Sequence, residues 1–291
     1  MAAITVGEGG LEKVTIKTEE GDSAEVYLHG GHLTSWKTAA GDELLFVSKE
    51  AIYKPPKAIR GGVPVCFPQF ADMGPINQHG FARNSTFAVE ASTPDSVTLV
   101  FKPSEAHLEI YPHPFELRIE VSIAPRTLSQ KMTVKNLGSS DMAFTCALHT
   151  YYRVGNINQA KVYIPTGQGN LEHLDSTDGR ARKQSDSNCV DFTEEVDRIY
   201  LKTSDAIKIV DGANGRGIGL EKSGFPDAVV WNPWIEKAKA TGDLGDEEYK
   251  EMLCVEPAVA ASGPIVLPAG ETWCGTQELT LAGGKNPHVK Q

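Results

Sequence analysis

The sequence predicts an all-β protein, folded as a sandwich or a barrel from many short strands. Apolar and polar residues alternate over short runs, which is the period of a half-buried strand. Turn-forming residues separate these runs, and convincing helical patterns are scarce. At 291 residues, one large all-β domain is an ordinary size, so a single domain over residues 1–291 is expected.

The strand pattern is clearest in Glu116–Ile123, where Leu117, Ile119 and Val121 would face the core. In chain order, the other expected strands are Val14–Thr18, Ala24–Leu28, Ser96–Phe101, Lys131–Lys135, Ala143–Leu148, Ala206–Val210, Ala228–Trp231 and Glu278–Leu281. Turns are expected at 21–22, 40–42, 136–140, 211–215 and 268–271. The best helix candidate is a short one within Gly242–Leu253.

Composition limits the classes of partner. The formal charge of −10 argues against nucleic acid or an anionic membrane surface, because both need a positive footprint. No secretory signal is visible, and no apolar run approaches the ~20 residues that span a bilayer. The five cysteines are far apart, which suits the reduced thiols of a cytoplasmic protein. His29 and His32 have no carboxylate or cysteine at ligand spacing, so no metal is expected.

The segment from Arg60 to Ser85 is the best candidate for a binding loop. It is rich in glycine and proline and too irregular for a helix or a clean strand, and loops on a rigid scaffold concentrate binding residues. Arg60 and Arg83 lie near glycines, which let the backbone approach a ligand closely. Because arginine suits bidentate capture of a phosphate or carboxylate, the loop predicts a concave site for a small, anionic, hydroxyl-rich ligand.

Three ionisable residues are candidates for chemistry. His149 and Glu256 each end an apolar strand run, where burial would move their pKa values toward neutrality. Each could equally be structural or face solvent, and the sequence leaves open whether they meet. His79 lies inside the loop and could contact a ligand or order the loop by hydrogen bonding.

Two further positions each allow two interpretations. Asp197 could bind sugar hydroxyls, although spacing alone favours an ion pair with Arg198. Trp231, with Trp234, could form a wall on which a sugar stacks, but a tryptophan more often packs in the core.

Six segments occur in a family-specific order: R-G-G-V-P-V-C-F-P-Q-F at 60–70, Q-H-G-F-A-R-N-S at 78–85, A-L-H-T-Y-Y at 147–152, V-D-R-I-Y at 196–200, V-V-W-N-P-W at 229–234 and V-E-P at 255–257. Together they resemble the hexose-phosphate mutarotases, the glucose-6-phosphate 1-epimerase branch of the aldose 1-epimerase superfamily. The resemblance extends from about Leu28 to Leu281. It implies the galactose-mutarotase-like β-supersandwich, in agreement with the strand alternation.

The resemblance also implies roles for individual residues. His149 would be the general acid/base and Glu256 its catalytic partner. The implied substrate-binding positions are Arg60, Gln78, Arg83 and Asp197, with His79 near the ring oxygen; Trp231 is added as the candidate for sugar stacking. Galactose-type enzymes act on free sugars, whereas the paired arginines here favour a phosphorylated one.

The expected activity is interconversion of the α and β anomers of hexose 6-phosphates, chiefly glucose 6-phosphate. Glu256 would be the base at the anomeric hydroxyl and His149, as imidazolium, the acid at the ring oxygen. The only expected partner of this cytoplasmic monomer is its small-molecule substrate, and no cofactor is expected. Two alternatives remain: a non-catalytic sugar-phosphate sensor on the same fold, and a glycosidase using Glu256 and Asp197.

Overall fold

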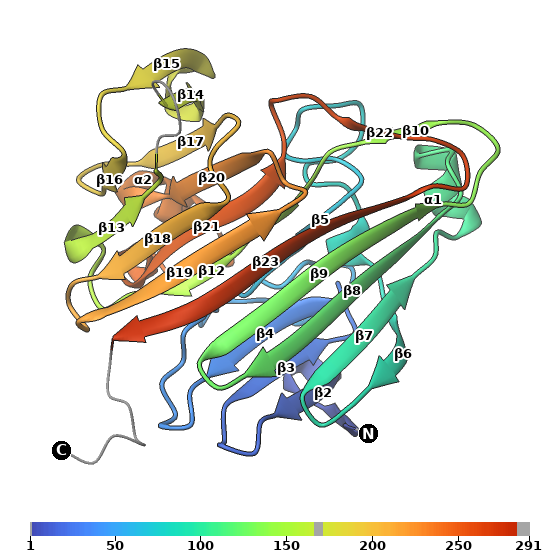
Figure 1. Ribbon diagram of the computed structural model, residues 1–291, viewed down its shortest axis with the longest axis horizontal. Helices are drawn as coiled ribbons and strands as arrows, with labels where there is room; N and C mark the ends of the chain where they lie inside the picture. The colour runs from blue at the N-terminus through green and yellow to red at the C-terminus, as the bar shows by residue number, and fades with distance from the viewer. Residues whose placement is uncertain (1, 166–170, 284–291) are drawn as a thin grey trace.

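The computed structural model describes residues 2–165 and 171–283, and its largest element is a nine-stranded antiparallel sheet (Figure 1). The strands of this sheet are β6 (Ala88–Ser92), β7 (Ser96–Phe101), β8 (Phe115–Ala124), β9 (Thr127–Asn136), β13 (Ala160–Tyr163), β16 (Cys189–Asp191), β18 (Ala206–Asp211), β19 (Arg216–Ser223) and β23 (Thr272–Gly283). Their order is β16-β13-β18-β19-β23-β9-β8-β7-β6. The long strands β8, β9 and β23 lie side by side along its centre.

A second, eight-stranded sheet carries three of the eight predicted site residues, Asp197, Trp231 and Glu256, each on a different strand. Its strands are β5 (Val65–Cys66), β11 (Cys146–Leu148), β12 (Tyr151–Arg153), β14 (Leu171–Asp175), β15 (Ala181–Ser185), β17 (Val196–Tyr200), β20 (Asp227–Asn232) and β21 (Met252–Val259). They run in the order β15-β14-β17-β20-β21-β11-β5, and β12 also pairs with β21. Strand β21 is buried along its whole length, which makes it the inner wall of this part of the molecule.

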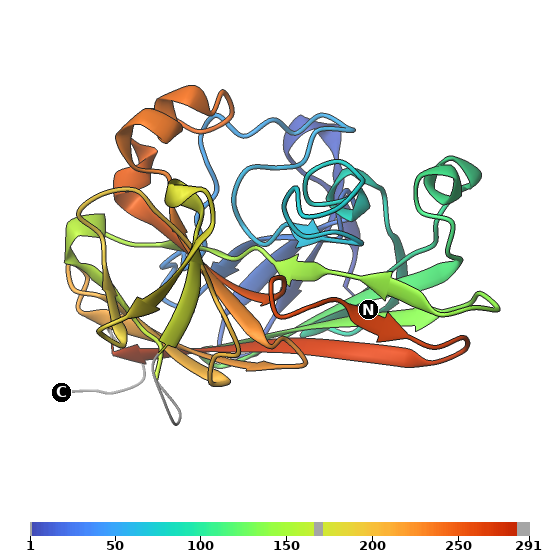
Figure 2. The ribbon, with the colours of Figure 1, turned by 90° about the horizontal axis from the view of Figure 1, so that it is seen from above.

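Two small sheets complete the β structure. The first is formed by β1 (Ile4–Val6), β2 (Glu12–Lys17), β3 (Ser23–Tyr27) and β4 (His32–Lys37), and the second by β10 (Met142–Phe144) and β22 (Ile265–Leu267). In Figure 2 the nine-stranded sheet lies along the lower edge, and the Arg60–Ser85 loop lies on the opposite side of the molecule. The loop can therefore line a site on that side of the molecule, while its Phe67 and Phe81 pack against Phe115 of β8.

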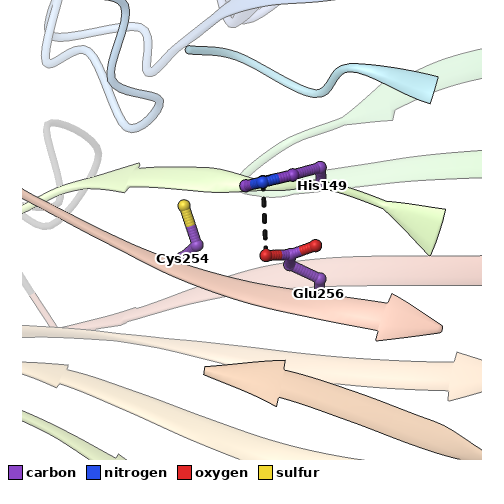
Figure 3. Close-up of side chains that lie close together, drawn as sticks. All are labelled: His149, Cys254 and Glu256. Atoms are coloured by element: carbon purple, nitrogen blue, oxygen red, sulfur yellow. Dashed lines mark ion pairs between the residues drawn. The ribbon is translucent and has the colours of Figure 1, made fainter. Parts of the chain in front are cut away.

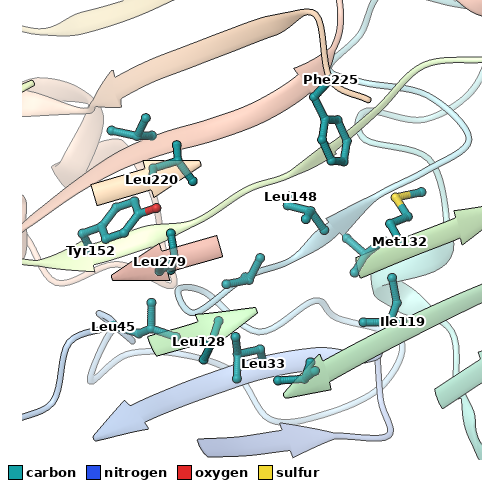
Figure 4. Close-up of a cluster of buried hydrophobic side chains, with 14 of the residues drawn as sticks. Leu33, Leu45, Ile119, Leu128, Met132, Leu148, Tyr152, Leu220, Phe225 and Leu279 are labelled. Carbon is teal, nitrogen blue, oxygen red and sulfur yellow. The ribbon is translucent and has the colours of Figure 1, made fainter. Parts of the chain in front are cut away.

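The hydrophobic core joins the nine-stranded sheet to the others. The predicted alternation in β8 is confirmed, because Leu117, Ile119 and Val121 are fully buried while Glu120 is exposed. Figure 4 shows this core, where residues of the large sheet meet Leu33 of the four-stranded sheet and Leu148 of the eight-stranded sheet. One continuous core of this kind fixes the sheets relative to one another.

All nine predicted strands overlap observed ones, but Ala143–Leu148 is not a single strand. It divides into β10 and β11 at Thr145. There the Thr145 N–H donates to the carbonyl of Pro68 at 3.1 Å, and its hydroxyl accepts the N–H of Phe70 at 2.7 Å. Thr145 thus ties the Arg60–Ser85 loop to the sheet, at the cost of a break in the ladder.

The short helix predicted within Gly242–Leu253 forms only as a 3-10 helix, η5 (Glu248–Glu251), before β21 begins. The buried Glu248 carboxylate accepts hydrogen bonds from the hydroxyl of Ser48 and the N–H groups of Lys49 and Gly245. The 3-10 hydrogen bonds of Glu248 to Gly245 and of Lys250 to Glu247 are therefore supplemented by contacts with Ser48 and Lys49, which are distant in the sequence.

Two α-helices occur where none was predicted: α1 (Glu105–Ile110) and α2 (Trp234–Ala240). The other 3-10 turns are η1 (Glu8–Gly10), η2 (Ala82–Asn84), η3 (Ile157–Gln159) and η4 (Ser176–Asp178). Among the described residues, no helix has the length and apolar character needed to cross a membrane.

Candidate active site

A pocket of about 490 Å³ opens between the Arg60–Ser85 loop and the eight-stranded sheet. This volume is within the usual range for small-molecule sites. The pocket is lined by Arg60, Phe70, Ala71, Asp72, Gln78, His79, Arg83, His149, Ser176, Arg180, Asp197, Ile199, Val229, Trp231, Lys237, Thr241 and Glu256. All eight residues that the sequence singled out for the site are in this lining.

His149 and Glu256 meet at the bottom of the pocket because of how β21 is paired. Strand β11 pairs with one end of β21 and β12 with the other, so the chain around His149 leaves the ladder opposite Glu256. The His149 Nδ1 and Glu256 Oε1 atoms lie 3.3 Å apart, and both side chains are almost completely buried (Figure 3). Their alignment is not that of a hydrogen bond, and among the described residues Nδ1 and the second oxygen, Oε2, have no hydrogen-bond partner.

Burial favours the uncharged form of both groups. It lowers the pKa of His149 well below its usual range, and the positive charges of Arg83 and Arg60 lower it further. Burial also raises the pKa of Glu256 well above its usual range, with a further increase from Asp197. In the empty site, therefore, a neutral imidazole lies beside a neutral carboxyl group, whereas the mechanism expected from the sequence needs His149 as imidazolium during the reaction. The neutral pair and the imidazolium–carboxylate pair contain the same number of protons. His149 and Glu256 therefore still hold one proton that can be transferred.

His79 fits both of its predicted roles. Its Nδ1 atom accepts the N–H of Ala71 at 3.1 Å, which orders the loop, while its ring lies edge-on to His149 with 5.5 Å between ring centres. Burial, followed by the charge of Arg83, lowers the pKa of His79 to about 3. A neutral ring that accepts at Nδ1 carries its proton on Nε2, so His79 is an available hydrogen-bond donor.

Arg60 is already paired with an acidic side chain. Its Nε donates to Oδ1 of Asp243 at 2.9 Å, and its Nη1 donates to the hydroxyl of Tyr151 at 3.2 Å. The Tyr151 ring stacks on His149, with 4.7 Å between centres and 10° between planes. Arg60 therefore supports the position of His149 through Tyr151, in addition to lining the pocket.

Arg83 is a pocket cation with a hydrogen-bond donor that has no partner among the described residues. Its Nη2 donates to the backbone carbonyl of Gln78 at 3.1 Å, whereas its buried Nε has no hydrogen-bond partner. In the described part of the chain no carboxylate forms an ion pair with Arg83. An unpaired guanidinium in an acidic protein is the group to which an anionic ligand would be drawn.

The opposite wall carries Asp197 and Trp231, which face each other across β17 and β20. The prediction, made from spacing, that Asp197 forms an ion pair with Arg198 is wrong. Adjacent strand residues point to opposite faces, and the Asp197 carboxylate pairs instead with Lys237 at 3.1 Å. Trp231 lies edge-on to His149 at 5.9 Å; it lines the pocket and also packs against a buried hydrophobic cluster that contains Tyr151.

Several lining residues were not predicted from the sequence. Lys237 and Arg180 come from a helix and a hairpin turn that no sequence pattern marked, whereas Asp72 lies within the predicted Arg60–Ser85 loop and was not singled out there. Tyr151, which stacks on His149 without being part of the lining, could also have been found, because it lies two residues after His149 and so on the same face of an extended chain.

One set of metal-ligand types occurs in the described residues. The donor atoms of His149, Cys254 and Glu256 lie within 4.8 Å of one another (Figure 3). Burial raises the pKa of Cys254 well above its usual range, which keeps it a neutral thiol. His29 and His32 instead bond to backbone carbonyls of the 57–61 segment, each at 2.7 Å, and anchor the start of the loop.

The comparisons with known proteins agree with this geometry. The family model described as aldose 1-epimerase matches residues 12–280. A curated relative from Cenchrus ciliaris, named "Putative glucose-6-phosphate 1-epimerase", is 42% identical over 283 residues and covers 93% of this chain and 85% of its own.

Two solved structures share the arrangement of the sheets. A protein from Salmonella typhimurium, titled a "putative mutarotase", superposes with a TM-score of 0.82 at 27% identity, covering 97% of both chains. A "galactose mutarotase related enzyme" from Lactobacillus acidophilus, 18% identical, has a TM-score of 0.77 and covers 96% of this chain and 100% of its own. The predicted galactose-mutarotase-like fold is confirmed, and the chain belongs to the aldose 1-epimerase family of isomerases.

Proposed function

We propose that this chain, acting as one domain, interconverts the α and β anomers of hexose 6-phosphates, chiefly glucose 6-phosphate. The observation that supports this most directly is the buried contact of His149 and Glu256, 3.3 Å apart, in a pocket that also contains the unpaired Arg83. The plant relative named for glucose-6-phosphate 1-epimerase supports the same substrate.

The reaction is the opening and closing of a hemiacetal. Opening requires that a proton leave the anomeric hydroxyl and that another reach the ring oxygen. In this proposal Glu256 takes the first proton and His149 donates the second. Rotation about the C1–C2 bond then presents the other face of the carbonyl, and closure reverses the two roles.

The sugar itself would help to charge the catalytic pair. Moving the shared proton from Glu256 to His149 gives the carboxylate and imidazolium that ring opening needs. The anomeric hydroxyl can donate a hydrogen bond to the carboxylate, and the ring oxygen can accept one from the imidazolium. Hydrogen bonds to charged forms favour those forms, so substrate binding would offset the burial that keeps the empty pair neutral.

The phosphate would bind first to Arg83, because Arg60 is already bonded to Asp243. We expect Arg83→Gln to lower kcat/KM for glucose 6-phosphate by roughly 10- to 100-fold, because a charged hydrogen bond contributes ~1.5–3 kcal/mol. The same change is expected to have little effect on free glucose. By contrast, Arg60→Gln is expected to impair both sugars, since it loosens the Tyr151 support of His149. Equal losses on the two sugars for Arg83→Gln would contradict the phosphate role.

The pH dependence follows from the pKa directions. At low pH the pair is inactivated when it gains a second proton, and the lowered pKa of His149 places this step below the usual 6.5. We therefore expect the acid limb of kcat/KM to lie below pH 6.5. Free glucose must be measured in parallel, because the phosphate group of a sugar phosphate itself titrates at about pH 6. An acid limb at or above pH 6.5 with free glucose would contradict the assignment.

NMR exchange spectroscopy of the anomeric protons, run across phosphorylated and free hexoses, tests the proposed activity. The wild-type protein is expected to accelerate exchange, with glucose 6-phosphate ahead of free glucose. Binding of glucose 6-phosphate without acceleration would favour the sensor alternative. Release of reducing ends from an oligosaccharide would favour the glycosidase alternative.

A further inference from the structure

Arg180 and Asp72 face each other across the rim of the pocket. Arg180 follows η4 in the turn between β14 and β15, and Asp72 belongs to the Arg60–Ser85 loop. The Arg180 Nη2 donates to Oδ1 of Asp72, and both residues line the pocket. This ion pair joins two rim elements that are 108 positions apart in the sequence.

The turn that presents Arg180 is built with a defined backbone. Arg180 has a φ of 61°, in the left-handed region that non-glycine residues rarely adopt. Its N–H donates to the carbonyl of Asp175 at 2.8 Å. The Asp175 carboxylate is in turn held by the backbone and hydroxyl of Thr177 and by Lys183 at 2.8 Å. The side chain of Arg180 therefore starts from a fixed position at the pocket.

Two other pocket cations are firmly paired. Arg60 bonds to Asp243, whose side chain is only 4% exposed. Lys237 contacts both Glu195 at 3.0 Å and Asp197 at 3.1 Å. Breaking the pair of Arg60 with the buried Asp243 is costly, and freeing Lys237 requires that two carboxylates, 33% and 22% exposed, both lose their partner.

Arg180 differs from those two cations because its partner is in solvent. The Asp72 side chain is 65% exposed and that of Arg180 is 39% exposed. Such exposed pairs contribute little and are easily exchanged. Arg83, which has no acidic partner in the described chain, supplies one positive charge, whereas a phosphate monoester carries about −1.5 to −2. A second, releasable cation at the pocket would complete the charge balance.

We propose that Arg180 is a phosphate-binding, specificity-determining residue that leaves Asp72 when a phosphorylated sugar enters, so that Arg180 and Arg83 hold the phosphate together. This inference rests on the proposed function. Asp72 then acts as a competing anion: it holds Arg180 while the pocket is empty, and it must be displaced by the phosphate.

Kinetics and binding can test this role separately. Arg180→Gln is expected to lower kcat/KM for glucose 6-phosphate by about 10-fold and to leave free glucose unchanged. Asp72→Asn is expected to tighten the binding of inorganic phosphate, measured by calorimetry, because Arg180 no longer has a competing partner. Arg182→Gln is the matched control: it removes the same charge two residues away, from a side chain outside the pocket lining.

The inference is overturned if Arg180→Gln binds inorganic phosphate as tightly as the wild-type protein or as Arg182→Gln. It is also overturned if Arg180→Gln slows free glucose as much as glucose 6-phosphate. A wild-type protein that binds phosphate through Arg180 but does not accelerate anomer exchange would support the phosphate site and refute the proposed function. The two ideas can thus fail independently.

Discussion

Glu256→Gln is expected to lower the catalysed exchange of glucose 6-phosphate anomers by about 10²–10⁴-fold. An amide has nearly the same shape as a carboxyl group but cannot take the proton of the anomeric hydroxyl. Glu256 is 1% exposed and its Oε2 has no hydrogen-bond partner among the described residues, so the substitution breaks no hydrogen bond found there. The loss should therefore appear in kcat, as measured by NMR exchange, with the fold intact.

The control for Glu256→Gln is Glu251→Gln, the same chemical change at a site whose side chain is 48% exposed. That glutamate precedes β21 and pairs with Arg153 at the surface, so wild-type exchange rates are expected. Retention of full activity by Glu256→Gln, with an unchanged unfolding temperature, would show that another group is the base.

His149→Asn is expected to cause a loss of similar size, about 10²–10⁴-fold, because it removes the proton donor at the ring oxygen. Residues that act as a unit have strongly non-additive effects. The double variant His149→Asn/Glu256→Gln is therefore expected to be about as slow as either single variant. Exchange rates for the three variants, measured at one enzyme concentration, give this comparison.

His173→Asn is the matched control for the histidine. His173 is also buried, at 4% exposed, and its Nδ1 bonds to the hydroxyl of Ser185 in a strand outside the pocket lining. It is expected to affect stability but not the exchange rate per folded molecule. Multiplied losses in the double variant would mean that His149 and Glu256 act in separate steps.

The fold was predictable where a strand has one buried face. The alternation in Glu116–Ile123 matches β8 because its apolar side chains are buried, whereas Arg118, Glu120 and Ser122 on the other side are half-buried or exposed. The prediction failed where tertiary contacts decide the backbone. Thr145 interrupts a continuous apolar run to bond with the Arg60–Ser85 loop, and the helix expected in Gly242–Leu253 is only a 3-10 helix, supplemented by hydrogen bonds to Glu248.

The ordered motifs predicted which residues line the pocket. They did not predict which of the charged side chains there are paired. The eight predicted residues lie in one pocket because the strand pairing of β11, β12 and β21 brings distant motifs together. Which cation is free depends on partners far away in the sequence, such as Asp243 for Arg60. The neutral state of the His149–Glu256 pair likewise comes from burial; the apolar runs indicated that burial, but not that it would lower the pKa of His149 well below its usual range.

The account depends on one claim, that His149 and Glu256 together move protons on a bound hexose 6-phosphate. The most direct test is the exchange rate between the anomeric protons of glucose 6-phosphate with the wild-type protein and with Glu256→Gln. We predict clear acceleration by the wild-type protein and its near-complete loss in the variant, while inorganic phosphate still binds both. Exchange at the uncatalysed rate with the wild-type protein, or equal acceleration by both proteins, would contradict the account.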